Sequence, residues 1–115
     1  MSESPIFVRV YDLLLWLIPA VEKFPRAQRP VLGRAVQEAA LGLQAHLTSA
    51  ALGDDPPGDL RRADVDLALL RARLRLCYDM RLITIGQYRH VSEQVAEVGR
   101  LLGGWRRQLQ RTAAP

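Results

Sequence analysis

Apolar side chains recur at intervals of three and four residues through most of this chain. Such intervals place side chains on one face of an α-helix. No stretch of five residues alternates apolar and polar side chains as a half-buried strand does. The pattern therefore predicts an all-α protein whose first helix spans about 6–22. The stripe of that helix consists of Ile6, Val10, Leu13, Leu17 and Val21.

Three further helices are predicted, at about 28–52, 59–82 and 85–107. Asp59 is the expected N-cap of the third helix, because its carboxylate can accept hydrogen bonds from the first turn. Thr84 with Gln87 fits the capping box of the fourth helix. The stripes expected to face the core are Val36, Ala39, Ala40, Leu43 and Leu47; Leu60, Ala63, Leu67, Leu70, Leu74 and Cys77; and Tyr88, Val91, Val95, Val98, Leu102 and Trp105.

Four helices joined by short connections predict a single up-down-up-down four-helix bundle over residues 1–115, with a disordered tail over about 111–115. A chain of this length can bury a core without disulfides or a metal. The first helix carries more apolar surface than one face of a small bundle needs, because Phe7, Leu14 and Trp16 widen its stripe. We expect self-association to bury the second side of this helix.

Three glycines interrupt the fourth predicted helix, at Gly99, Gly103 and Gly104. Each interior glycine costs a helix about 1 kcal/mol relative to alanine, which favours a use for the missing side chain. Gly99 and Gly103 are four residues apart and share a face, so a neighbouring backbone could approach closely there. The alternative is a helix that ends at Gly103, with Trp105 as a capping hydrophobic residue.

Arginine supplies nearly all of the positive charge, since Lys23 is the single lysine among sixteen basic residues and the net charge is +4. Arginine binds phosphates with two parallel hydrogen bonds and stacks on bases, so an arginine-rich domain is a reasonable nucleic-acid binder. The competing interpretation is that these arginines are solvated or paired with Asp and Glu on helix surfaces. The arginines that lie in clusters along the sequence are the candidates for nucleic-acid binding. They are Arg26, Arg29, Arg71, Arg73, Arg75, Arg106 and Arg107.

The sequence contains little that indicates a catalytic site or a metal-binding site. His46 and His90 have no cysteine or carboxylate at ligand spacing, and Cys77 lies on an apolar stripe, where a packed thiol is expected. There is no Walker loop and no pair of carboxylates at catalytic spacing. We therefore predict no catalytic, cofactor or metal site. With one cysteine and no apolar run of eighteen residues, we expect a cytoplasmic protein without a membrane partner.

A series of short motifs resembles the Avd family, the accessory variability proteins of diversity-generating retroelements. These proteins are four-helix bundles related to the proteins encoded in intervening sequences of 23S ribosomal RNA genes. The resemblance spans about residues 5–107 and depends on the order and spacing of the motifs. The motifs are Lys23-Phe24-Pro25-Arg26, Arg29, Leu32-Gly33, Leu60, Ala63-Asp64, Leu70-Arg71, Arg75-Leu76, Asp79, Tyr88 and Gly99-Arg100-Leu101-Leu102-Gly103-Gly104-Trp105.

The resemblance implies a homopentameric barrel with a basic surface. Such a barrel would bind the reverse transcriptase of the retroelement and its template RNA or DNA, and so support mutagenic retrohoming without catalysis of its own. Residues expected to serve packing or oligomer contacts are Phe7, Leu14, Trp16, Gly99, Gly103 and Trp105. The alternative function is that of a structural or interaction protein of the 23S intervening-sequence type, which forms a stable oligomer and has no retroelement role.

Overall fold

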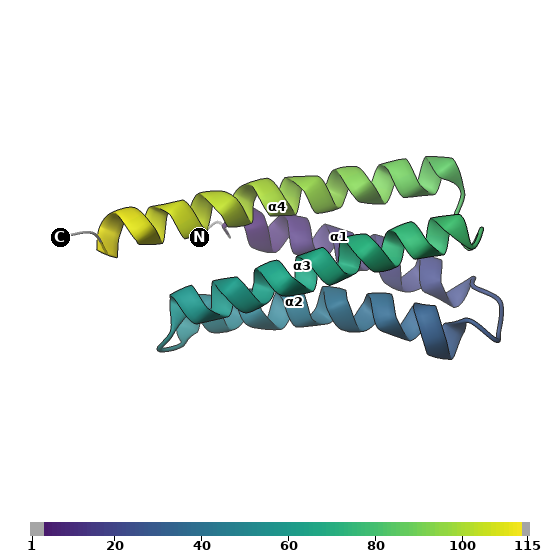
Figure 1. Cartoon of the computed structure of the whole chain (residues 1–115), viewed down its shortest axis with the longest axis horizontal. Helices are drawn as coiled ribbons and strands as arrows, with labels where there is room; N and C mark the ends of the chain where they lie inside the picture. The colour runs from purple at the N-terminus through teal and green to yellow at the C-terminus, as the bar shows by residue number, and fades with distance from the viewer. Residues whose placement is uncertain (1–3, 114–115) are drawn as a thin grey trace.

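The computed structural model describes residues 4–113 and consists of four α-helices with no strand in that range. The helices are α1 (Pro5–Glu22), α2 (Arg34–Leu52), α3 (Pro56–Asp79) and α4 (Ile85–Ala113), and a π-helical turn, η1 (Arg29–Gly33), leads into α2. They form an elongated bundle of 52 × 27 × 23 Å (Figure 1). The prediction of an all-α fold with four helices is confirmed.

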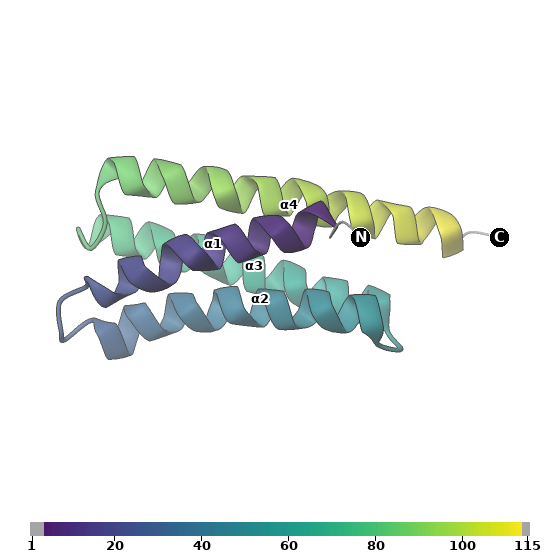
Figure 2. The same cartoon turned by 180° about the vertical axis from the view of Figure 1, so that it is seen from behind.

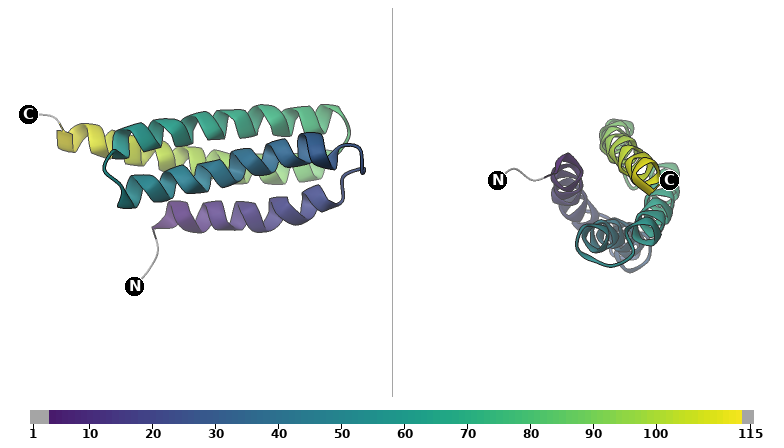
Figure 3. Two further views of the ribbon diagram at one scale, coloured as in Figure 1. Left: turned by 90° about the horizontal axis from the view of Figure 1, so that it is seen from below. Right: turned by 90° about the vertical axis from the view of Figure 1, so that its left-hand side faces the viewer.

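Each helix packs against two others, so that α1 and α3 lie at opposite corners of the bundle, as do α2 and α4. Figure 2 shows α1 between α2 and α4, and the end-on view in Figure 3 shows the four helices arranged around the common axis. The α1–α2 and α3–α4 connections lie at one end, and the α2–α3 connection lies at the other (Figure 1). This arrangement groups residues from both helical hairpins at each end.

The core contains the predicted stripes. All five residues of the first stripe are buried, and so are all members of the stripes predicted for the second and third helices. In α4, the valines of the predicted stripe and Leu102 are buried, whereas Tyr88 and Trp105 are partly buried and pack against the core. Burial of these side chains is the main favourable contribution to folding, at about 25 cal/mol per Å² of apolar surface.

The start of α3 differs from the prediction. The helix begins at Pro56, and Asp55 rather than Asp59 is its N-cap, with a carboxylate oxygen that accepts a hydrogen bond from the Gly58 N–H at 3.1 Å. Proline lacks the N–H group that a first-turn residue leaves unpaired, so two prolines fit at this position. The segment from Gly53 to Gly58 has a composition typical of a turn, but its last three residues form the first turn of α3.

The end of α4 also differs from the prediction. The helix continues through Gly103 and Gly104 to Ala113, past both the predicted end at residue 107 and the alternative end at Gly103. Residues 111–113 are helical, and residues 114–115 of the predicted tail lie outside the described range. Because α4 is longer than α1, its last turns extend beyond the start of α1 (Figure 3). The predicted capping box at the start of α4 is confirmed by reciprocal bonds between Thr84 and Gln87 of 2.8 and 3.1 Å.

The π-helical turn η1 at the start of the second helix was not predicted; in it the N–H of Gly33 donates to the carbonyl of Gln28 at 2.9 Å. Gly33 is buried there, and a Cβ atom at this position would lie 2.7 Å from Cγ1 of Val21. The backbones of α1 and η1 therefore approach closely because residue 33 has no side chain. No helix within residues 4–113 is both long enough and apolar enough to cross a membrane.

Candidate nucleic-acid interface

The two halves of the bundle differ in charge. We define the basic half as residues 14–42 and 71–93, which surround the α1–α2 and α3–α4 connections, and the neutral half as the remaining described residues. The basic half contains nine basic residues against Glu22, Glu38, Asp79 and Glu93, and the neutral half contains seven against seven acidic residues. The basic residues of the basic half are Lys23, Arg26, Arg29, Arg34, Arg71, Arg73, Arg75, Arg81 and Arg89.

Ion pairing increases this difference. In the neutral half, four of the seven arginines lie within 4.0 Å of a carboxylate, namely Arg9, Arg62, Arg100 and Arg106. In the basic half, only Arg34 and Arg75 do so among the described residues. Unpaired guanidinium groups can still bind phosphate, so the basic half has the larger capacity for a polyanion.

Two of the candidate arginines are held by backbone carbonyl groups. Nη1 of Arg73 donates to the carbonyl of Ala35 at 2.9 Å and so joins α3 to α2. Nε of Arg29 donates to the carbonyl of Phe24 at 2.9 Å, across the α1–α2 connection. Both bonds are partly buried, and each leaves other guanidinium N–H groups for a ligand.

Three other candidates contact neighbouring residues of the chain. Nε of Arg75 donates to both carboxylate oxygens of Asp79, and Nη1 of Arg106 donates to Asp64 across the α3–α4 contact at 3.1 Å. Arg71 extends over α4 at Gly99, where a Cβ atom would lie 2.5 Å from its Nη2. Gly99 therefore faces α3 of its own chain, and its missing side chain leaves room for the Arg71 guanidinium.

The remaining two candidates, Arg26 and Arg107, lie in different halves. Arg26 is exposed in the α1–α2 connection of the basic half, and Arg107 lies on α4 in the neutral half. The structure thus brings Arg26, Arg29, Arg71, Arg73 and Arg75 into one half of the bundle and leaves the Arg106–Arg107 pair in the other. Sequence clustering alone could not separate these two groups.

Two tyrosines stack at the α3–α4 end of the basic half. The rings of Tyr78 and Tyr88 are nearly parallel, with an interplanar angle of 8° and centroids 4.8 Å apart. Both tyrosines are partly buried, and Arg71 and Arg81 line the hollows beside them. Tyr88 was predicted to face the core, whereas Tyr78 was not among the predicted site residues. The available signal for Tyr78 was its position three residues after Arg75, on the same flank of the helix.

Arg81 has a backbone conformation that arginine rarely adopts. Its φ is +61°, in the left-handed region, and it is the residue that follows the C-cap of α3. Its N–H donates to the carbonyl of Tyr78, and the N–H of Leu82 donates to that of Cys77, both at 2.9 Å. This is the Schellman arrangement, in which glycine is the usual residue at the position of Arg81. A left-handed non-glycine residue costs about 1 kcal/mol or more.

A scan against family models matches the bAvd-like model over residues 6–109. This match covers nearly the whole chain. The chain belongs to the bAvd-like family. A search of curated proteins finds no match. The resemblance to Avd proteins inferred from the motifs is therefore confirmed at the level of the family.

The predicted packing residues of this bAvd-like protein make contacts within one chain. Phe7 packs edge-on against Trp105, with ring centroids 6.2 Å apart. The ring centroids of Trp16 and His90 are 5.5 Å apart, and Leu14 is buried. A Cβ atom at Gly103 would meet Nη1 of Arg107, on the same helix, at 3.2 Å. The apolar side of α1 that points outward consists instead of Val8, Tyr11 and Leu15, which the sequence analysis missed although they are three and four residues apart.

The bAvd-like chain buries its single thiol. Cys77 has no exposed surface and belongs to the core cluster, as its place on the apolar stripe predicted. Burial raises the pKa of the Cys77 thiol to about 11, because the low-dielectric core disfavours the thiolate. Nδ1 of His46 contacts the carboxylate of Asp66 at 2.5 Å and so links α2 to α3, and both side chains are partly buried.

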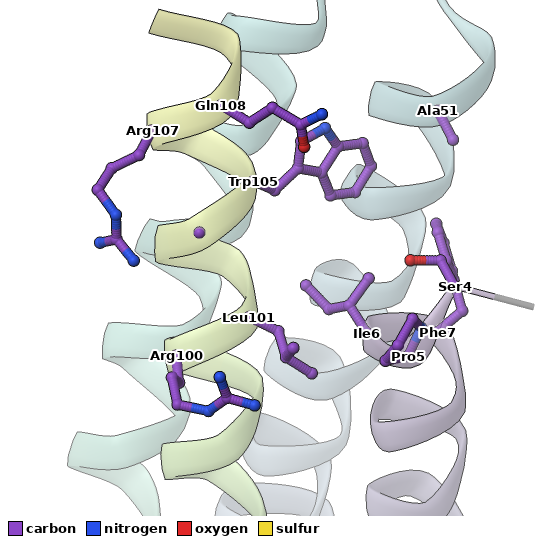
Figure 4. A pocket seen from close by; sticks show the side chains of 11 residues that line it. Ser4, Pro5, Ile6, Phe7, Ala51, Arg100, Leu101, Trp105, Arg107 and Gln108 are labelled. Atoms are coloured by element: carbon purple, nitrogen blue, oxygen red, sulfur yellow. The ribbon is translucent and has the colours of Figure 1, made fainter. Parts of the chain in front are cut away.

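The neutral half of the bAvd-like bundle contains the hollow drawn in Figure 4. It has a volume of about 490 Å³ and lies between the first turn of α1, the end of α2 and the glycine-rich part of α4. Trp105 and Gln108 point across it from α4, whereas Arg107 points away to the other side of the helix. Arg100, at its lower edge in this view, is paired with Glu97. Of the two arginines that line the hollow, Arg107 is the one without an ion pair in the described residues.

Proposed function

We propose that this protein is a non-catalytic accessory protein of a diversity-generating retroelement. In this role it binds template RNA or DNA through the basic half of the bundle and binds the reverse transcriptase of the element, and so supports mutagenic retrohoming. The observation that carries the nucleic-acid part is the excess of unpaired arginine in one half of a bAvd-like bundle.

The charge distribution supports a polyanionic ligand more strongly than total charge does. An even spread of charge attracts polyanions weakly, whereas a concentrated field raises both affinity and association rate. Within the basic half, Arg26 and Arg71 are exposed members of the candidate set whose side chains make no hydrogen bond or ion pair in the described residues. We expect these two to contact phosphates, with Arg29 and Arg75 beside them and Arg73 chiefly joining α3 to α2.

The exposed apolar residues support the proposed oligomer. On α1 they include Tyr11 and Leu15, which are 57% and 58% exposed, and on α3 they include Val65 and Leu69, which are 55% and 40% exposed. Because α1 and α3 lie at opposite corners, the two stripes lie on different sides of one chain. A stripe on one copy that packs against the other stripe on the next copy generates a ring when the rotation between copies closes. We therefore propose a cyclic homo-oligomer, with the pentamer of the Avd family as the expected size.

Nucleic-acid binding is tested by gel shift and fluorescence anisotropy with RNA, DNA and hybrid duplexes at two salt concentrations. We expect binding at about 50 mM salt and a loss of about 10³-fold or more at about 200 mM if several phosphates are contacted. Absence of binding at the lower salt would contradict the proposal. That result would favour a structural protein of the intervening-sequence type, for which the paired arginines of the neutral half provide support.

Binding of the reverse transcriptase is tested separately. The tagged chain is mixed with the purified reverse transcriptase of a diversity-generating retroelement, with and without nuclease treatment. We expect a nuclease-resistant complex, because the accessory role requires a direct protein contact. Recovery only in the absence of nuclease would mean that nucleic acid alone links the two proteins.

The oligomer is tested by light scattering and native mass spectrometry. We expect a ring of five copies, and we expect Leu15→Glu or Val65→Glu to dissociate it, because a buried unpaired carboxylate is costly. Leu52→Glu is the matched control, since Leu52 is 83% exposed and lies at the end of α2 away from both stripes. A wild-type monomer would contradict the proposed ring.

A further inference from the structure

The Tyr78–Tyr88 pair combines three features that an ordinary helix contact does not need. Two parallel aromatic rings lie at a surface end of the bundle, Arg71 and Arg81 line the hollows beside them, and Arg81 has a strained backbone. Apolar side chains of other kinds join α3 to α4 elsewhere in the bundle. Aromatic side chains with arginine are the combination that binds unpaired bases.

A hollow lies beside each tyrosine. The one beside Tyr78 has a volume of about 470 Å³ and includes Arg81, Thr84 and Gln87 in its lining. The one beside Tyr88 has a volume of about 190 Å³ and includes Arg71. Each tyrosine therefore lies next to open space that an arginine lines, although the guanidinium of Arg71 extends from there toward Gly99. The larger volume falls in the range of sites that hold small organic groups.

The backbone of Arg81 indicates that its side chain is used. Glycine would occupy the left-handed position that follows the C-cap without strain, and arginine there reduces stability. Its side chain is exposed, and in the described residues it makes no hydrogen bond or ion pair within the chain that would offset the cost. Strained residues of this kind concentrate at functional sites. A ligand phosphate would give the guanidinium a partner.

We propose that the Tyr78–Tyr88 pair with Arg81 and Arg71 is a site for single-stranded nucleic acid, in which an unpaired base stacks on the tyrosines and the arginines bind the flanking phosphates. This inference rests on the proposed function, and it identifies the strand state of the ligand. Bases in a duplex are covered by their neighbours, so only an unpaired base can stack on these rings. The chemistry is shared by RNA and DNA.

The neighbouring acidic residue does not oppose this ligand strongly. Asp79 lines the larger hollow, and Nε of Arg75 donates to both of its carboxylate oxygens at 3.2 and 3.1 Å. That ion pair offsets the carboxylate charge near the proposed phosphate position. Gln87 uses its Oε1 atom in the capping box, which leaves its amide N–H groups for the edge of a base.

The test measures anisotropy of the full-length protein with labelled (dT)15, (U)15 and a 15-base-pair duplex of mixed sequence at about 100 mM salt. We expect tighter binding to single strands than to the duplex. Tyr88→Leu should weaken single-strand binding by about fivefold or more, since stacking on one aromatic ring contributes that much. Tyr88→Phe should bind as the wild type does, because the ring and not the hydroxyl makes the stack.

The variant Arg81→Gly distinguishes a role of Arg81 in phosphate binding from a role in stabilising the fold. We expect this variant to melt at a higher temperature than the wild type and to bind single strands several-fold more weakly. Arg61→Ala is the matched control, because Arg61 is an exposed arginine of α3 in the neutral half and its replacement should leave binding unchanged. A 2-aminopurine base placed within (dT)15 should change its fluorescence on binding the wild type but not Tyr88→Leu.

The outcomes distinguish this inference from the proposed function. If the wild type binds no nucleic acid even at about 50 mM salt, the proposed function itself fails. If it binds but prefers the duplex, or if Arg81→Gly and Tyr88→Leu bind single strands as the wild type does, only the single-strand site is overturned. A difference between (dT)15 and (U)15 would identify which of the two nucleic acids the site prefers.

Discussion

The basic half and the neutral half of the bundle are built on the same kind of core and differ in how their arginines are used. In the neutral half, Arg62 lies 3.1 Å from Asp59 and Arg106 lies 3.1 Å from Asp64, so charge is largely cancelled where it occurs. In the basic half, most arginines have no carboxylate within 4.0 Å among the described residues. The fold does not require this excess, because buried apolar stripes run through both halves.

The difference shows why total charge is a weak guide to function. A net charge of +4 is modest for a chain of this length and would fit an ordinary solvated helical protein. The up-down topology concentrates the positive charge in one half, and the resulting electrostatic field attracts a polyanion to that half. The two halves therefore serve as internal controls for one another.

The largest effect is expected from removal of charge. Replacement of Arg26, Arg34, Arg81 and Arg89 by Gln should lower affinity for nucleic acid more than tenfold at about 100 mM salt. The slope of log K against log salt should become shallower by about 0.7–0.9 for each phosphate that the variant no longer binds. Titrations at several salt concentrations measure both quantities.

The matched control replaces four arginines of the neutral half. The variant with Arg9, Arg61, Arg62 and Arg111 changed to Gln carries the same net charge and should lose much less affinity. An equal fall in affinity for the two variants would mean that net charge, and not its location, governs binding.

A smaller effect is expected from alanine at glycines in the two halves. Gly33→Ala should destabilise the fold by about 1–3 kcal/mol, because its Cβ would lie 2.7 Å from Cγ1 of the buried Val21. Gly103→Ala should stabilise the fold by up to about 1 kcal/mol, because it meets only the flexible end of Arg107 and alanine favours a helix. Chemical denaturation measures both changes. Similar effects at the two positions would contradict the assignment of close packing to Gly33.

Unpairing an arginine in the neutral half should have a still smaller effect. Asp64→Asn removes the partner of Arg106, and both side chains are more than one third exposed, so the cost should be about 1 kcal/mol or less. The freed guanidinium adds positive charge to the neutral half. Binding assays should show a small gain in affinity, and a decrease would mean that Asp64 itself contributes to the site.

The smallest effect concerns pH. The hydrogen bond from Arg100 lowers the pKa of Glu97, so the folded state favours the carboxylate more than the unfolded chain does. The pair therefore stabilises the fold above the unfolded pKa of about 4.3, and this contribution is lost as the pH falls through the folded pKa. The melting temperature of Glu97→Gln should lie slightly below that of the wild type at pH 7 and match it near pH 2.5. A difference that persists at low pH would exclude ionisation as its cause.

Several local features could be predicted because neighbours in the sequence produce them. The Thr84–Gln87 capping box joins residues three apart, and the buried stripes follow from the helical repeat. Asp59 was the wrong N-cap because Asp55 competes for the same role, and the structure places two prolines inside the first turn. The glycines of α4 were taken as a possible helix end, but packing against α3 and α1 outweighs their low helix propensity.

The candidate site could be predicted only in part, since its residues come from distant segments. The sequence identified the arginine clusters, but the structure shows that Arg73 bonds to the carbonyl of Ala35 and that Arg81 has a positive φ. It also places Tyr78 parallel to Tyr88 across the α3–α4 connection. The Arg73 bond and the tyrosine stack depend on how two helices pack, and the positive φ of Arg81 belongs to a helix end at which the sequence has no glycine to mark it.

By itself, the sequence determined the number of helices, most of the buried stripes and the family, because the helical repeat and the order of motifs are properties of the linear chain. The tertiary structure alone decided which glycine permits close approach, that Arg106 pairs with Asp64 on another helix, and which charges gather in one half of the bundle. These outcomes depend on distances between residues that the chain separates by many positions, and only the packed bundle sets those distances.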